Sequence, residues 1–137
     1  MGRWLSIDYG EKNIGLAITD PLKIFVTPLT TIENKSDKSI FTNLQEIFLK
    51  QEIEKIIVGL PLSLEGNDTE KTKEVRLFFE KLSKKTVIPI EWWDERFSTV
   101  EANEFLKKKG MNWKESRKII DQVAAAVILT NYLENRR

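Results

Sequence analysis

The chain has 137 residues, 41% hydrophobic and 31% charged, with 22 basic residues against 21 acidic ones. This size and composition predict one globular domain spanning residues 1–137. Cysteine and histidine are both absent, which excludes disulfides, thiolate or imidazole metal sites and cysteine nucleophiles. No apolar run approaches the roughly 20 residues that span a bilayer, and the amino terminus does not resemble a signal peptide. We therefore expect a cytoplasmic protein without a membrane partner.

The first part of the chain predicts an antiparallel meander. Apolar runs at residues 3–8 and 13–19 flank a glycine-containing turn, and a run rich in Ile, Val, Phe and Thr follows at 24–32. Apolar residues then recur at helical spacing from 40 to 48, after three polar residues that can each cap the helix: Ser36, Asp37 and Ser39.

Strands and helices alternate in the rest of the chain. Residues 55–59 form a continuously apolar strand, and the helix before it implies a crossover connection with parallel pairing. A helix around 75–82 and a strand at 87–93 follow. Ser-x-x-Glu at 98–101 and Asn-x-x-Glu at 112–115 open two further helices, the first of which ends at Gly110. The order predicts an α/β fold with a five-stranded mixed sheet flanked by helices.

Two acids occupy apolar surroundings. Asp8 ends the first strand, and Asp121 lies in the apolar helical segment 119–127 beside the small residues Ala124 and Ala125, which leave space next to it. A buried carboxylate is costly unless it is compensated, and without His or Cys the expected partner is oxygen-ligated Mg²⁺ or Mn²⁺. Two alternatives stay open: that Asp8 only caps a turn, and that Asp121 faces solvent or pairs with Lys118 or Arg117.

A third acidic cluster ends the fifth strand at Asp94 and Glu95. Strand alternation places Glu91, Trp93 and Glu95 on one side, and spacing alone does not choose between Asp94 and Glu95. Three converging carboxylates would repel one another, whereas two divalent ions roughly 3.5 to 4 Å apart would neutralise them.

Basic residues gather near the carboxyl terminus. Residues 101–137 contain eight basic side chains against five acidic ones, a local excess of +3. Lys114, Arg117 and Lys118 are candidates for contacts to a phosphate backbone, although such charges are more often only solvated. The loop 59–69 lacks the Walker pattern and is more simply a connection, with Ser63, Asn67 and Thr69 as candidate phosphate contacts. For most of the four tryptophans we expect a role in core packing, with stacking on nucleic-acid bases as the alternative.

The chain resembles the YqgF family of RNase H-like proteins, described as pre-16S rRNA nucleases or Holliday junction resolvases. The resemblance runs from Leu5 to about Tyr132 and rests on four ordered blocks: Asp8-Tyr9-Gly10-x-x-x-Ile14-Gly15-x-Ala17, Ile57-Val58-Gly59-Leu60-Pro61, Asp94-Glu95-Arg96-Phe97-Ser98-Thr99-x-Glu101-Ala102 and Asp121-x-x-Ala124-Ala125. The chain departs from the family at Asn13, Phe97 and Gln122, which leaves the acids intact and slightly thins the basic surface.

The resemblance implies an RNase H-like fold and assigns Asp8, Glu95 and Asp121 as catalytic acids and ligands of a two-metal site, with substrate contacts at Ser98 and Thr99. It implies a hydrolase, a Mg²⁺- or Mn²⁺-dependent endonuclease that processes the 5′ end of pre-16S rRNA in ribosome biogenesis. Three alternatives are weighed against it: a Holliday junction resolvase, a non-catalytic nucleic-acid-binding factor that retains the fold, and an ATP-handling protein, for which one domain is too little. The sequence leaves open RNA against DNA and monomer against homodimer.

Overall fold

The computed structural model describes residues 2–95 and 113–135, with side chains in the last helix from residue 120 onward. Within these ranges, five strands and three helices are present: β1 (Arg3–Tyr9), β2 (Asn13–Thr19), β3 (Val26–Glu33), α1 (Asp37–Lys50), β4 (Ile53–Leu60), α2 (Glu70–Lys85), β5 (Ile90–Asp94) and α4 (Trp113–Asn135). The predicted helix that ends at Gly110 lies outside the described residues, as does the cap predicted at Asn112. None of the described helices is long and apolar enough to cross a membrane.

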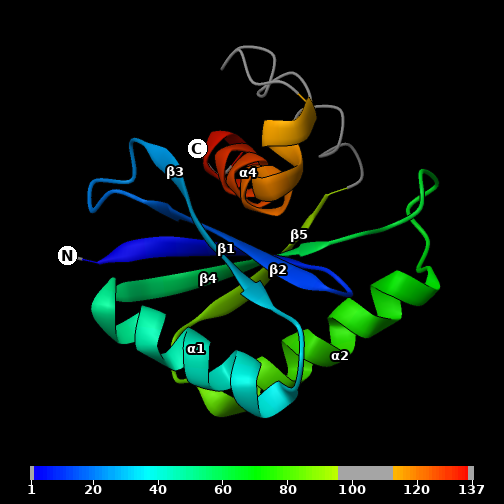
Figure 1. The fold of residues 1–137 in the computed structure, drawn as a ribbon, viewed down its shortest axis with the longest axis horizontal. Helices are drawn as coiled ribbons and strands as arrows, with labels where there is room; N and C mark the ends of the chain where they lie inside the picture. The colour runs from blue at the N-terminus through cyan, green and yellow to red at the C-terminus, as the bar shows by residue number, and fades with distance from the viewer. Residues whose placement is uncertain (1, 96–112, 136–137) are drawn as a thin grey trace.

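The strands form one mixed sheet in the order β3-β2-β1-β4-β5. The pairs β1·β2 and β2·β3 are antiparallel, while β1·β4 and β4·β5 are parallel. The predicted meander followed by parallel strands is therefore confirmed. Helix α1 carries the chain back across the sheet, so β4 pairs with β1 in the centre and not with β3, its predecessor in sequence (Figure 1).

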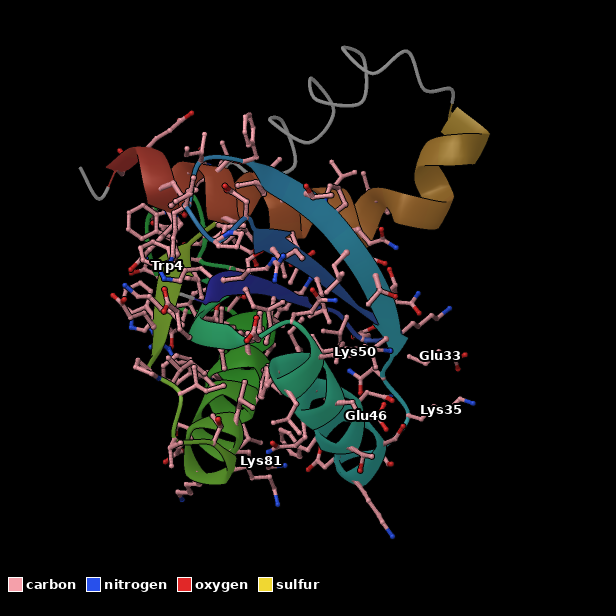
Figure 2. The ribbon with its side chains drawn as sticks, turned by 90° about the vertical axis from the view of Figure 1, so that its left-hand side faces the viewer. Trp4, Glu33, Lys35, Glu46, Lys50 and Lys81 are labelled. Atoms are coloured by element: carbon pink, nitrogen blue, oxygen red, sulfur yellow. The ribbon has the colours of Figure 1, made fainter. Side chains whose placement is uncertain are left out.

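The helices form two layers with the sheet between them. Helices α1 and α2 cover one face and α4 covers the other, as the two perpendicular views show (Figures 1 and 2). Figure 2 also shows charged side chains such as Glu46 and Lys81 on the α1 and α2 side of the molecule. Because side chains alternate along a strand, every second residue of the sheet faces α4.

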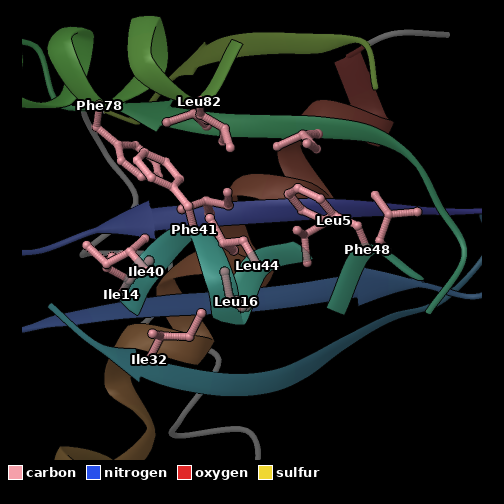
Figure 3. Close-up of a cluster of buried hydrophobic side chains, with 14 of the residues drawn as sticks. Leu5, Ile14, Leu16, Ile32, Ile40, Phe41, Leu44, Phe48, Phe78 and Leu82 are labelled. Atoms are coloured by element: carbon pink, nitrogen blue, oxygen red, sulfur yellow. The ribbon is translucent and has the colours of Figure 1, made fainter. Parts of the chain in front are cut away.

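The larger core lies between the sheet and helices α1 and α2. Leu5 of β1 and Leu16 of β2 are fully buried there, and they lie in one cluster with Leu44 of α1 and Leu82 of α2 (Figure 3). The stacked rings of Phe41 and Phe78, with centroids 6.1 Å apart, join the two helices. This face of the sheet is closed by packing. On the opposite face, a smaller apolar cluster joins Ile57 of β4 to Ile128 and Leu129 of α4.

Local polar groups set where the elements begin. Ser36 caps α1 by accepting a hydrogen bond from the Ser39 amide at 3.2 Å. Strand β3 begins at Val26 and not at residue 24, because the Asp20 carboxylate accepts hydrogen bonds from the amides of residues 24 and 25, each at 2.7 Å. Strand β5 begins at Ile90, three residues later than predicted. Proline lacks an amide donor, and residue 89 contributes only its carbonyl, which accepts from the Ile56 amide at 2.9 Å.

Candidate active site

Asp8 and Glu95 lie on the face of the sheet that α4 covers. Asp8 shares this face with Ser6, whose hydroxyl donates a 2.5 Å hydrogen bond to the carbonyl of Ala125 in α4. Glu95 follows β5 on the same side as Trp93, whose ring packs edge-on against Tyr132 of α4. The predicted alternation of side chains along β5 is confirmed here. The Glu95 amide donates to the Leu60 carbonyl at 3.1 Å, so the backbone pairing with β4 continues to this acid.

The side chains of Asp8 and Glu95 are joined by a hydrogen bond. Burial, with the adjacent charge of Asp8, raises the pKa of Glu95 to about 9, and burial also raises the pKa of Asp8. The hydrogen bond favours the neutral form of Glu95 and the charged form of Asp8, so protonated Glu95 donates to the Asp8 carboxylate. Glu95 therefore keeps its proton at neutral pH.

Gly59 on β4 gives Glu95 the room to reach Asp8. Strand β4 lies between β1 and β5, and Ile7 of β1 pairs with Val58, so Asp8 and Gly59 follow side by side. A Cβ atom on Gly59 would lie 2.8 Å from Oε2 of Glu95 and 2.4 Å from Cδ1 of Ile128. Any larger residue at position 59 would occupy the space through which the two carboxyl groups meet.

Gly15 on β2 brings helix α4, and with it Asp121, close to the sheet. Gly15 is the register partner of Asp8, and a Cβ atom on it would lie 1.9 Å from the carbonyl oxygen of Asp121. The helix backbone thus rests directly on the strand backbone. The glycines on the two strands flanking β1 thereby set the positions of Asp121 and Glu95 relative to Asp8.

Asp121 stands near the Asp8–Glu95 pair but does not join it. Its side chain lines a surface hollow of about 520 Å³, together with residues of the β1–β2 turn and of α2. Burial raises the pKa of Asp121, and the charge of Asp121 adds to the burial effect that raises the pKa of Asp8. Among the side chains that the structure describes, no three of the Asp, Glu, His or Cys types are grouped closely enough to hold one metal ion.

The Asp8–Glu95 pair fits a divalent cation by its chemistry. Two hard oxygen ligands that share a proton can exchange that proton for a metal ion, because the ion compensates both partly buried charges at once. Asp121 would have to come closer for all three acids to share a site. Mutual repulsion between Asp8 and Asp121 opposes that approach while no cation lies between them.

The space predicted beside Asp121 is filled at Ala125. Ala125 is fully buried and packs against Ala17 of β2. The space beside this small residue is therefore occupied by the sheet and not open to a ligand. Gln122, at a departure from the family pattern, donates a 3.1 Å hydrogen bond to the Thr31 hydroxyl of β3. These contacts fix α4 on the sheet.

The loop candidates for phosphate binding have local roles. The Ser63 hydroxyl accepts from the amide of Asn67 at 3.0 Å, and Thr69 caps α2 in reciprocal hydrogen bonds with Thr72. The segment is thus an ordinary strand-to-helix connection, as the sequence favoured.

Two of the tryptophans differ in their surroundings. Trp4 packs edge-on against Tyr132, while Trp92 is about half exposed (49%).

The structure does not describe the side chains of the residues predicted to contact the substrate. Ser98 and Thr99 lie outside the described residues, and Lys114, Arg117 and Lys118 belong to α4 with their backbones alone described. The structure instead adds Lys71, in the first turn of α2, which lines the hollow with Asp121. Nothing in the sequence distinguished this lysine from the other basic residues, because its place beside the acids depends on how α2 packs.

A family model described as "RuvX: Holliday junction resolvase" matches residues 2–135. The chain belongs to the RuvX family. The resemblance deduced from the four sequence blocks is thereby confirmed. Relatives of this RuvX chain include proteins named "Putative pre-16S rRNA nuclease" from Koribacter versatilis, 39% identical over 98% of this chain and 88% of the relative, and from Caldicellulosiruptor bescii, 43% identical over 96% of both chains. The predicted nuclease class agrees with the family and with these relatives.

Solved structures confirm the predicted RNase H-like fold. The Fowlpox virus resolvase, in a complex with Holliday junction DNA, superposes with a TM-score of 0.63 at 12% identity and covers 98% of both chains. RuvC from T. thermophilus, in complex with a Holliday junction substrate, gives a TM-score of 0.59 at 15% identity over 99% of this chain and 96% of RuvC. At these identities the likeness concerns the fold of the RuvX chain.

Proposed function

We propose that this RuvX chain is a divalent-metal-dependent endonuclease that hydrolyses phosphodiester bonds in structured nucleic acid, with Asp8, Glu95 and Asp121 as its catalytic acids. The observation that carries the proposal is the hydrogen-bonded pair of Asp8 and Glu95, at the carboxyl ends of β1 and β5, with Asp121 near it. Two partly buried carboxyl groups held in contact are costly for stability, which favours a functional role for the pair.

Asp8 and Glu95 would hold a Mg²⁺ or Mn²⁺ ion, and Asp121 would complete a two-metal site. When bound, such ions supply positive charge to a phosphodiester and lower the pKa of water. The residues contribute position and charge: β1 and β5 fix the first two carboxylates, and α4 presents the third at the hollow. Ser98, Thr99, Lys114, Arg117 and Lys118 complete the proposed surface as contacts to the substrate backbone.

The favoured substrate is the precursor of 16S rRNA, which the relatives at 33% to 43% identity carry in their names. The family description and the two resolvase structures favour a second substrate, a four-way DNA junction. Processing of rRNA would place the protein in the cytoplasm, as its sequence predicts. Residues 1–137 would act as one nuclease domain, since every described element packs on one sheet.

Cleavage assays with both substrates test the proposal. Purified protein is incubated with a 5′-extended 16S rRNA fragment and with a four-way DNA junction, with Mg²⁺, with Mn²⁺ or with a chelator. Asp8→Asn should reduce cleavage by more than about 100-fold, the upper range seen when even supporting groups of a metal site are removed. Asp37→Asn, an exposed change at the start of α1, is the matched control.

Equal cleavage by Asp8→Asn and the original chain would refute the assignment. Binding without cleavage by the original chain would leave a non-catalytic nucleic-acid-binding factor. Mass in solution, measured on the same samples, connects substrate to assembly: a two-fold homodimer suits a symmetric junction, and a monomer suits one RNA strand.

A further inference from the structure

Lys71 lies at the hollow beside Asp121. It lines this hollow with Asp121 and Gly10, and it belongs to the first turn of α2. Among the described parts of the chain, its ammonium group has no ion pair or hydrogen bond. Lys73, two residues on, is instead paired with Glu70 at 3.4 Å. Lys71 is thus a cation held near acids that it does not neutralise by direct contact.

The charge of Lys71 nevertheless reaches all three acids. Burial raises the pKa of Asp8, Glu95 and Asp121, and the positive charge of Lys71 partly offsets that rise in each of them. This single cation therefore lies within electrostatic reach of carboxyl groups from β1, β5 and α4, and it lines the same hollow as the acid on α4. Lys71 therefore marks the approach to the acids from the side of α2.

The hollow is otherwise unfavourable for an anion. Its charged lining residues are four acids and two lysines: Glu11, Glu70, Glu74, Asp121, Lys12 and Lys71. The acidic side chains of this lining would repel a phosphodiester that enters the hollow, unless cations accompany it or are already bound there. Lys71 supplies a fixed positive charge at that point, and its three rotatable donors suit a phosphate oxygen.

We propose that Lys71 is a substrate-binding residue, whose ammonium group contacts a non-bridging oxygen of the phosphodiester held at the Asp8, Glu95 and Asp121 site. The inference rests on the proposed nuclease function for its site and extends it to a residue outside the recognised sequence blocks. Lys71 holds the phosphate on the α2 side, and the acids face it from the sheet and α4.

Binding and cleavage assays on Lys71→Ala, Lys71→Arg and Lys81→Ala test the inference. Lys81 lies on the same helix (Figure 2), pairs with Asp37 at 2.9 Å and is not among the residues that line the hollow, so its loss is the matched control. Fluorescent 16S rRNA precursor fragment and fluorescent four-way DNA junction are titrated against each variant in an Asp8→Asn background, which keeps the probes intact. Steady-state cleavage is measured in the background that retains Asp8.

Lys71→Ala should weaken binding of the preferred probe by about tenfold or more, the loss expected for one charge-assisted contact. It should raise KM more than it lowers kcat, and it should make binding less sensitive to salt. Lys71→Arg should restore most of the affinity, and Lys81→Ala should behave like the original chain. The probe whose binding responds identifies RNA or DNA as the partner.

Unchanged affinity and KM in Lys71→Ala would overturn the inference. So would a loss of Mn²⁺ affinity, measured by calorimetry on the retained-Asp8 background, without any loss of probe binding, because removing a cation from a phosphate contact should not weaken metal uptake. A chain that binds the probes but cleaves neither would defeat the nuclease proposal alone, since the binding comparison still decides the role of Lys71.

Discussion

The carboxyl groups of Asp8 and Glu95 share a hydrogen bond across strand β4, although they belong to strands that are not neighbours in the sheet. The contact needs a strand between them that carries no side chain at that point, and Gly59 provides it. Each carboxylate alone would cost free energy because it is partly removed from water, and Gly59 lets the two meet. This arrangement has measurable consequences for stability and for metal binding.

The stability of the metal-free protein should fall as pH rises. The pKa of Glu95 is raised from 4.5 to about 9 in the folded chain, so the folded state binds more protons than the unfolded state between these values. The contribution is fully present below pH 4.5 and is lost progressively as pH rises through about 9, at no more than about 1.4 kcal/mol per pH unit. Denaturant unfolding with a chelator, across this range, measures the slope.

Glu95→Gln should flatten this pH dependence, because the amide stays neutral in both states. Glu46→Gln, an exposed change on α1, should keep the original slope (Figure 2). Identical slopes in the original chain and Glu95→Gln would show that Glu95 is not the titrating group.

Gly59→Ala should separate the acid pair at a moderate cost in stability. The new methyl group would meet the flexible end of Ile128 at 2.4 Å and Oε2 of Glu95 at 2.8 Å. We expect a loss of roughly 1 to 3 kcal/mol, the usual range for overpacking, together with weaker Mn²⁺ binding in calorimetry. Adding Ile128→Val should recover part of the stability without recovering metal affinity; recovery of both would mean that the acids are unaffected.

Gly15→Ala makes the same chemical change on β2 and should be more damaging. Its methyl group would lie 1.9 Å from the carbonyl oxygen of Asp121, and backbone cannot rotate away as a side chain can. We expect a loss of more than roughly 3 kcal/mol, since α4 must move off the sheet. Thermal unfolding beside Gly59→Ala measures the difference, and equal midpoints for the two variants would contradict the close approach of α4.

Tyr132→Phe should lower stability and leave cleavage unchanged. The Tyr132 hydroxyl donates a 2.6 Å hydrogen bond to Glu91, which also pairs with Lys55 at 2.6 Å. Losing a hydrogen bond to a charged group typically costs about 1.5 to 3 kcal/mol, and the phenylalanine ring keeps the edge-on contacts with Trp4 and Trp93. A double-mutant cycle with Glu91→Gln checks the coupling, and additive losses would argue against it.

Some features of the site could be predicted from the sequence because they depend on the local pattern of residues. Period-two alternation placed Glu91, Trp93 and Glu95 on one side of β5, and Trp93 indeed packs against α4. Other expectations depended on neighbours that the pattern does not report. The space expected beside Asp121 is occupied at Ala125 by Ala17 of β2, and Lys71 gave no signal because only the packing of α2 carries it to the acids.

The sequence by itself determined the mixed sheet, the meander followed by a crossover, the presence of acids at the ends of apolar elements and the family. These follow from hydrophobic periodicity, turn residues and ordered motifs, which are properties of continuous segments. Only the tertiary structure decided that Glu95 forms a hydrogen bond with Asp8 across Gly59, that Gly15 lets α4 rest on the strand, and that Asp121 and Lys71 line one hollow. Those relationships depend on strand register and on the distance between helix and sheet, which are set by packing between segments far apart in the chain.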